Sequence, residues 1–179
     1  MPTNIEIKAR AHDLSRQTAL TEALGEGPPV ELQQEDTFFP AIHGRLKLRI
    51  LGPDHGELIH YERADGHGPR PSLYRIAVTR EPQALLETLT AALGTSGVVR
   101  KHRRLVMIGQ TRVHLDEVER LGSFIELEVV LRRDQSRDEG MAIAQHFMRQ
   151  LDIRQEDLVD CAYIDLLQKQ GGDSAAPGA

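Results

Sequence analysis

Ionisable side chains occupy every second position in much of the stretch from Thr111 to Val130, which has the pattern of two β-strands joined by a turn. Because the side chains of a strand point alternately to its two faces, each strand would have one aliphatic face and one ionisable face. Carboxylates are hard oxygen ligands suited to Mg²⁺ or Mn²⁺, whereas arginine is suited to phosphate oxygens. The hairpin therefore carries the residue types for chemistry on metal-bound phosphates, although on a simple sheet the same face would only meet water. The ionisable residues are Arg112, His114, Asp116, Glu126 and Glu128.

Four further segments repeat this alternation, and most of them are rich in cations. On an edge strand, basic residues would prevent aggregation, and a basic run is typical of a solvated face or of a nucleic-acid patch. A nucleic-acid patch is not favoured, because the chain has no Trp, a formal net charge of -5 and no aromatic residue within the basic run from 98 to 107. The residues that share a face are Asn4, Glu6 and Lys8; Arg45, Lys47 and Arg49; Tyr61 and Arg63; and Lys101 and Arg103.

The chain has about eight strand-like segments, separated by short turns or by helices expected at residues 13–24, 81–93, 136–151 and 155–168. Short turns favour antiparallel pairing, and such a sheet can close into a barrel. If the charged faces met water, the aliphatic faces would fill the barrel and leave the helices little apolar surface to pack against. The opposite assignment places the charged side chains of both signs in a tunnel, where they compensate one another. The prediction is an α+β fold, a closed eight-stranded antiparallel β-barrel (tunnel) with helices packed outside.

Length and composition indicate a single domain at residues 1–168, followed by a disordered tail at residues 169–179. The chain has 179 residues, of which 40% are hydrophobic and 27% charged, and its single cysteine, Cys161, excludes an internal disulfide. No apolar run is long enough to span a bilayer, and the N-terminal MPTNIEIKAR lacks the apolar core of a signal peptide. We expect a cytoplasmic protein without nucleic-acid or membrane partners, and homodimer formation stays open.

Taken in order along the chain, these motifs resemble those of the CYTH domain family, also called triphosphate tunnel metalloenzymes, which includes class IV adenylate cyclases and thiamine triphosphatases. The resemblance covers about residues 1–168 and implies an antiparallel eight-stranded tunnel, in agreement with the alternation argument. The N-terminal signature of the family is Glu-x-Glu-x-Lys, and in this chain Asn4 replaces the first glutamate. The other matches are Lys47-Leu48-Arg49, Tyr61-Glu62-Arg63, Lys101 with Arg103, Arg112-x-His114-x-Asp116, and Glu126-x-Glu128.

The resemblance implies a division of roles within the tunnel. One or two Mg²⁺ or Mn²⁺ ions would be held by carboxylates, namely Glu6, Asp116, Glu126 and Glu128. The triphosphate would be gripped by Lys8, Lys47, Arg49, Arg63, Lys101, Arg103 and Arg112. The catalytic set would be Glu6, Lys8, Glu126 and Glu128. By contrast, we expect His114 to be a satisfied tunnel histidine without a catalytic role, and Tyr163 to be a packing residue.

Three functions fit this pattern. The favoured one is metal-dependent hydrolysis of an inorganic or organic triphosphate, a small-molecule substrate. The first alternative is a class IV adenylate cyclase that converts ATP to cyclic AMP and pyrophosphate, for which the loop at residues 64–72 is the candidate adenine pocket. The second alternative, suggested by Asn4, is a non-catalytic phosphate-binding module. For an enzyme, Glu126→Ala or Glu128→Ala should abolish turnover and leave the fold intact, because either change removes a negative charge from the tunnel.

Overall fold

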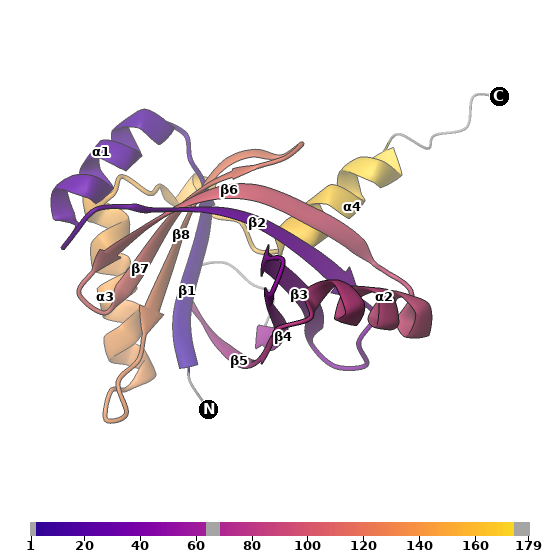
Figure 1. Cartoon of the computed structure of the whole chain (residues 1–179). Coiled ribbons are helices and arrows are strands. Elements are labelled where there is room, and N and C mark those ends of the chain that lie inside the picture. The colour runs from indigo at the N-terminus through magenta and orange to yellow at the C-terminus, as the bar shows by residue number, and fades with distance from the viewer. Residues whose placement is uncertain (1–2, 64–68, 174–179) are drawn as a thin grey trace.

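Eight antiparallel strands form one closed barrel in the computed structural model, which describes residues 3–63 and 69–173. The order of strands around the barrel is β1-β5-β4-β3-β2-β6-β7-β8, so the first strand closes the ring between β5 and β8 (Figure 1). The predicted closed eight-stranded antiparallel barrel with helices outside is therefore confirmed. The strands are β1 (Thr3–Arg10), β2 (Val30–Phe39), β3 (Arg45–Gly52), β4 (His55–Arg63), β5 (Arg70–Thr79), β6 (Gly97–Ile108), β7 (Thr111–Val118) and β8 (Gly122–Val130).

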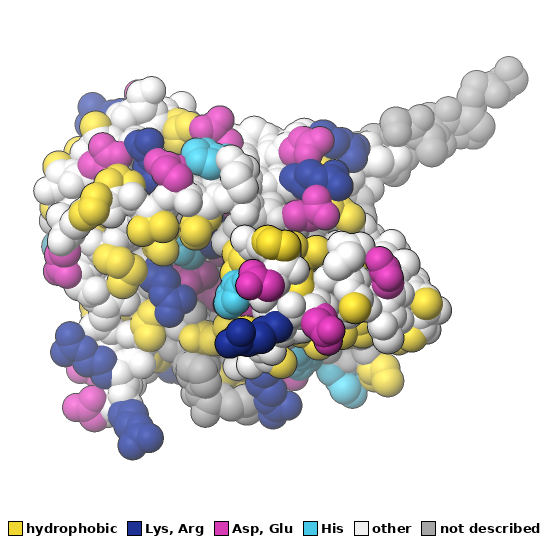
Figure 2. Space-filling view, in the orientation of Figure 1, with side chains coloured by type: hydrophobic (Ala, Val, Ile, Leu, Met, Phe, Trp, Pro, Cys, Tyr) yellow, Lys and Arg dark blue, Asp and Glu magenta, His cyan; other side chains and the backbone are white. Residues whose placement is uncertain are grey.

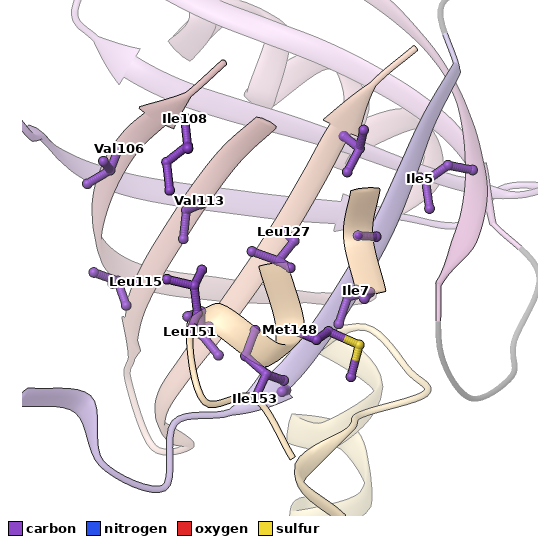
Figure 3. Packing of buried hydrophobic residues seen from close by; sticks show 14 residues of the cluster. Ile5, Ile7, Val106, Ile108, Val113, Leu115, Leu127, Met148, Leu151 and Ile153 are labelled. Carbon is purple, nitrogen blue, oxygen red and sulfur yellow. The ribbon is translucent and has the colours of Figure 1, made fainter. Parts of the chain in front are cut away.

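Much of the hydrophobic core lies outside the barrel wall, between the aliphatic strand faces and two helices. Helices α1 (Leu14–Leu24) and α3 (Arg137–Gln150) cover β1, β6, β7 and β8. Ile5 and Ile7 of β1 are 0% and 1% exposed and point outward toward α3, whereas the alternate positions face the interior (Figure 3). The alternation of the sequence thus places apolar residues under the helices. The cluster also includes Val113, Leu127, Ala144, Met148 and Leu151.

A second apolar cluster closes one end of the barrel with the start of α4 (Tyr163–Asp173). Phe124 of β8 is fully buried there, and its ring centroid lies 4.8 Å from that of Tyr163. The helix expected at 155–168 is different in the structure: residues 155–157 form a short 3-10 turn (η1), and the α-helix starts only at Tyr163. The reason is a tertiary contact, because the Val159 amide donates to the Lys8 carbonyl at 2.8 Å and holds the segment extended beside β1.

The remaining helix, α2 (Pro82–Leu93), lies beside β2, β3 and β4, on a part of the barrel that α1 and α3 leave uncovered (Figure 1). Proline at the first helical position suits the start of α2, because its missing amide would have had no helical partner. None of the described helices is both long enough and apolar enough to cross a membrane.

Candidate active site

A cavity of about 380 Å³ occupies the interior of the barrel, and every one of the eight strands contributes side chains to its wall. In Figure 2, basic and acidic side chains gather at the hollow near the centre of the face that is shown. The wall includes most of the residues expected from the sequence: Glu6, Lys8, Lys47, Arg49, Lys101, Arg103, Arg112, His114, Glu126 and Glu128. The side chain of Arg63 lies outside the described part of the structure, as do residues 64–68 of the loop proposed for adenine, and Asp116 is not among the lining residues.

The acidic part of the wall is formed by β1 and β8. In their register Glu6 lies opposite Glu128, and Lys8 lies opposite Glu126 with its Nζ 3.8 Å from Oε1. Two carboxylates directly opposite on neighbouring strands repel each other, so this position favours a cation between them. Glu128 also has Arg112 as a partner, whose Nη1 donates to Oε2 at 3.2 Å.

The donor set beside this pair fits a hard divalent ion. Within residues 3–63 and 69–173, no three His, Cys, Asp or Glu side chains already lie together in a metal-binding arrangement. However, Asn4 is 3% exposed, lines the cavity and has a buried Oδ1 without a hydrogen-bond partner. A buried acceptor without a donor is costly, and a metal ion would satisfy it. Asn4, Glu6 and Glu128 are therefore the residues best placed to supply oxygen ligands to Mg²⁺ or Mn²⁺.

Asp116 is fully buried behind the cavity wall and holds Arg103 in place. The Arg103 guanidinium donates from Nε to Oδ1 at 2.7 Å and from Nη2 to Oδ2 at 2.6 Å, and Nη2 also donates to Glu126 Oε2 at 2.9 Å. The Tyr163 hydroxyl donates to Oδ2 of Asp116 at 2.9 Å. Burial alone would raise the pKa of Asp116, but Arg103 and Lys101 outweigh it and lower that pKa far below its usual range. These contacts engage Asp116 as the buried partner of Arg103 and Tyr163, whereas the sequence predicted it as a metal ligand.

A basic part of the wall lies on β3 and β6, and the neighbouring strand β2 adds an acid that sequence reasoning missed. Asp36 on β2 is 2% exposed and accepts hydrogen bonds from Lys47 Nζ at 2.7 Å and from Arg49 Nε and Nη2 at 2.7 and 2.8 Å. Burial alone would raise the pKa of Asp36, but Lys47 and Arg49 hold it well below the usual value. Burial and the neighbouring Arg103 lower the pKa of Lys101 to about 7. The sequence signal for Asp36 was its spacing of two residues from Gln34 and from Phe38, which places all three side chains on one face of β2.

Two residues expected to be passive lie at the cavity. His114 lines the cavity with its Nδ1 buried, 4.0 Å from Glu126 and 3.9 Å from Glu128, and it contributes to the low pKa of Glu126, so the expectation of a histidine satisfied by its neighbours stays a prediction. Tyr163 packs as expected, but it also lines the cavity, and the Lys8 Nζ lies 4.0 Å from the centre of its ring. A cation over an aromatic face is attracted by it, so Tyr163 helps to orient Lys8.

The whole arrangement separates two kinds of group across one enclosed space. Oxygen donors for a metal lie on β1 and β8, with Lys8 and Arg112 beside them, whereas the other four lining lysine and arginine side chains lie on β3 and β6. A ligand that carries several phosphates could bridge the two sides, with metal-bound oxygens at one end and guanidinium and ammonium groups at the other. Aromatic rings add a third feature, because Tyr61 and Tyr74 are paired across β4 and β5 and both line the cavity.

Comparison with known proteins agrees with this fold. Residues 2–163 match the CYTH domain, and the chain therefore belongs to the CYTH domain family, the triphosphate tunnel metalloenzymes. A candidate adenylate cyclase of Methanocaldococcus jannaschii is 23% identical over 169 residues, which cover 90% of this chain and 97% of the relative.

Solved structures share the barrel at low sequence identity. A protein from Pyrococcus horikoshii OT3 superposes with a TM-score of 0.79 at 23% identity, covering 91% of this chain and 98% of that one. A candidate adenylyl cyclase from Hippeastrum, whose structure is described as revealing a dominant triphosphatase activity, has a TM-score of 0.63 at 16% identity and covers 95% of this chain and 96% of that one. At these identities the likeness establishes the fold alone.

Proposed function

We propose that this protein is a divalent-metal-dependent triphosphatase that binds a triphosphate chain inside the barrel and releases orthophosphate. The observation that carries the proposal is one cavity of about 380 Å³ whose wall holds oxygen donors on β1 and β8 and four of its six lysine and arginine side chains on β3 and β6. Phosphoryl transfer needs little covalent participation by the protein and relies on positioning and charge stabilisation, which such a wall provides. The triphosphatase activity described for the Hippeastrum relative supports the choice of reaction.

The two sides of the cavity are assigned different roles in this proposal. Glu6 and Glu128, with the Asn4 amide oxygen, would hold Mg²⁺ or Mn²⁺, which when bound neutralises phosphate oxygens and acidifies a water molecule. The cations Lys47, Arg49, Lys101, Arg103 and Arg112 bind the non-bridging phosphate oxygens, and Arg63 is proposed for the same task. Water attacks the terminal phosphorus, the bond to the bridging oxygen breaks, and that oxygen stays with the diphosphate product.

Lys8 and Glu126 link the two sides. Glu126 is 7% exposed and contacts both Lys8 and Arg103, so it fixes the two cations that flank the metal ligands. Lys8 in turn lies over the Tyr163 ring, which fixes its ammonium group at the end of the cavity. Both residues are proposed to act in catalysis by holding the reacting phosphate in one position.

Adenylate cyclase activity is the second candidate, and one observation favours it. Tyr61 and Tyr74 lie opposite each other in the register of β4 and β5 and face the cavity, where an aromatic base could stack. The same two rings would equally suit another aromatic group joined to a triphosphate. Product analysis separates these possibilities, because a cyclase forms cyclic AMP and pyrophosphate, whereas a hydrolase forms orthophosphate.

The test is an assay of phosphate release and cyclic AMP formation on tripolyphosphate, thiamine triphosphate and ATP, with Mg²⁺, Mn²⁺ or EDTA. Arg112→Gln and Arg104→Gln form a matched pair, because both side chains are 37% exposed and paired with glutamate, but only Arg112 faces the cavity. Loss of a charged hydrogen bond to phosphate should cost about 1.5 to 3 kcal/mol, so Arg112→Gln should lower kcat/KM by at least about tenfold. Arg104→Gln should leave it within about twofold. Metal-independent release, or equal effects of the two variants, would contradict the proposal.

A further inference from the structure

Asp36 holds two of the cavity cations in the geometry that they would use for a phosphate group. Its two carboxylate oxygens accept a fork of two hydrogen bonds from Arg49, at 2.7 and 2.8 Å, and a third from Lys47 at 2.7 Å. Arginine binds carboxylate and phosphate with the same pair of parallel hydrogen bonds. The carboxylate therefore occupies the donors that an incoming phosphate would need.

The position of Asp36 makes this contact different from the other buried acid–arginine pair. Asp116 is not among the lining residues and receives an additional hydrogen bond from Tyr163, so a ligand in the cavity would not meet its carboxylate directly. Asp36 lines the cavity itself, and among the described residues only Lys47 and Arg49 donate hydrogen bonds to it. A phosphate bound by Lys47 and Arg49 would come close to this negative charge.

We propose that Asp36 is an internal counter-anion that competes with the phosphate chain for Lys47 and Arg49 and thereby weakens the affinity of the empty site for polyanions. The inference rests on the proposed triphosphate-binding function. Without a ligand, Asp36 compensates two buried cations and stabilises the barrel. When the phosphate enters, the same carboxylate repels it, and part of the donor set must be released from Asp36.

This role gives a pair of opposite effects that neither a purely structural residue nor a simple ligand-binding residue would produce. Asp36→Asn keeps the size of the side chain but removes its charge, which leaves Lys47 and Arg49 poorly compensated in the empty protein. The variant should therefore unfold at a lower temperature than the wild type when no ligand is present. It should also bind a polyanion more tightly, because the phosphate no longer meets a fixed negative charge.

The experiment measures the binding of tripolyphosphate by calorimetry in EDTA, where metal-dependent turnover is absent, and the thermal unfolding of the same samples. Glu35→Gln is the matched control, because Glu35 is the next residue of β2 and also accepts a 2.7 Å hydrogen bond from an arginine, Arg100, but on the exposed outer face. We expect Asp36→Asn to lower the dissociation constant for tripolyphosphate by at least about tenfold. We also expect it to lower the unfolding temperature of the free protein and to enlarge the increase in unfolding temperature that tripolyphosphate causes. We expect Glu35→Gln to bind like the wild type.

The remaining outcomes are also decisive. Unchanged or weaker binding by Asp36→Asn, with the wild type binding normally, overturns the inference and leaves the proposed function standing. If neither protein binds tripolyphosphate in EDTA or with added Mg²⁺, the proposed function itself fails, and the inference fails with it. If Asp36→Asn is unfolded alone, tripolyphosphate should restore a cooperative unfolding transition, and failure to restore it would also overturn the inference.

Discussion

Glu126 and Glu128 are two residues apart on β8 and both line the cavity, but the structure predicts very different consequences for their replacement. The Glu126 side chain is 9% exposed and contacts Lys8 at 3.8 Å and Arg103 at 2.9 Å. The Glu128 side chain is 17% exposed, and its Arg112 partner at 3.2 Å is itself 37% exposed. Burial would raise the pKa of Glu126, but Lys8, His114 and Arg103 hold it well below its usual value. Glu126 is thus ionised in the folded state and compensates buried cations.

The size of the two effects follows from this difference. Removing one partner of a buried ion pair costs about 3 to 5 kcal/mol, so Glu126→Gln should lower the free energy of unfolding by about 3 kcal/mol. Partly exposed pairs contribute about 0.2 to 1 kcal/mol, which is the loss expected for Glu128→Gln. In a protein of this size, 1 kcal/mol shifts the unfolding temperature by about 2 to 4 °C, so the two variants should differ by roughly 4 to 11 °C.

Two measurements on the same preparations test this reasoning. Urea unfolding gives the free energy of unfolding, and phosphate release from tripolyphosphate with Mg²⁺ gives the turnover of each variant. Both variants should lose at least about 100-fold in kcat, because both remove a charge that positions the phosphate or the metal. The sequence alone suggested that either substitution would leave the fold intact, whereas the contacts of Glu126 predict this only for Glu128. Equal losses of stability would refute the assignment of Glu126 as a buried counter-ion, and full activity of Glu128→Gln would refute its place in the metal site.

Three further predictions concern other parts of the wall. Asn4→Glu should increase the affinity for Mn²⁺ by about tenfold in calorimetry, because a carboxylate is a stronger ligand than an amide, and an unchanged affinity would place the metal elsewhere. The pKa of Asp36 is depressed in the folded protein, so its ionised carboxylate stabilises the fold above the unfolded pKa of about 4. This stabilisation is lost as the pH falls toward the folded pKa. The stabilities of the wild type and of Asp36→Asn should therefore converge on acidification. Tyr163→Phe removes the donor of a 2.9 Å hydrogen bond to the buried Asp116 and should destabilise the fold by about 1 to 3 kcal/mol in urea unfolding, and no loss would show that this bond contributes nothing.

The features that could be predicted from sequence are those set by the period of two in a strand. Once β1 was placed with its apolar residues outside, Glu6 and Lys8 had to face the interior, and the same argument placed Lys101 and Arg103 on β6. Asp116 shows the limit of this reasoning. It shares the alternation of Arg112 and His114, but the β6–β7 register sets it opposite Arg103, and that pairing is not visible in the sequence of either strand.

Asp36 was missed for a similar reason, because its function depends on a contact between strands. In β2 it is followed by Thr37, Phe38 and Phe39, so no run of charges draws attention to it. Only the pairing of β2 with β3 sets Asp36 opposite Arg49. Periodicity therefore identifies which side chains enter the tunnel, and the register between strands decides which of them neutralise one another.

The balance of charge in the cavity connects metal binding to phosphate binding. Among the described lining residues, six are lysine or arginine and five are aspartate or glutamate, so the empty interior is close to neutral. This balance lets the barrel fold without a ligand, because buried charges are tolerated when they are paired. A polyanion alone would upset the balance, and a divalent cation that enters with it would restore part of it. Affinity for tripolyphosphate should therefore rise when Mg²⁺ or Mn²⁺ is present, and by linkage the polyanion should raise the affinity for the metal by the same factor.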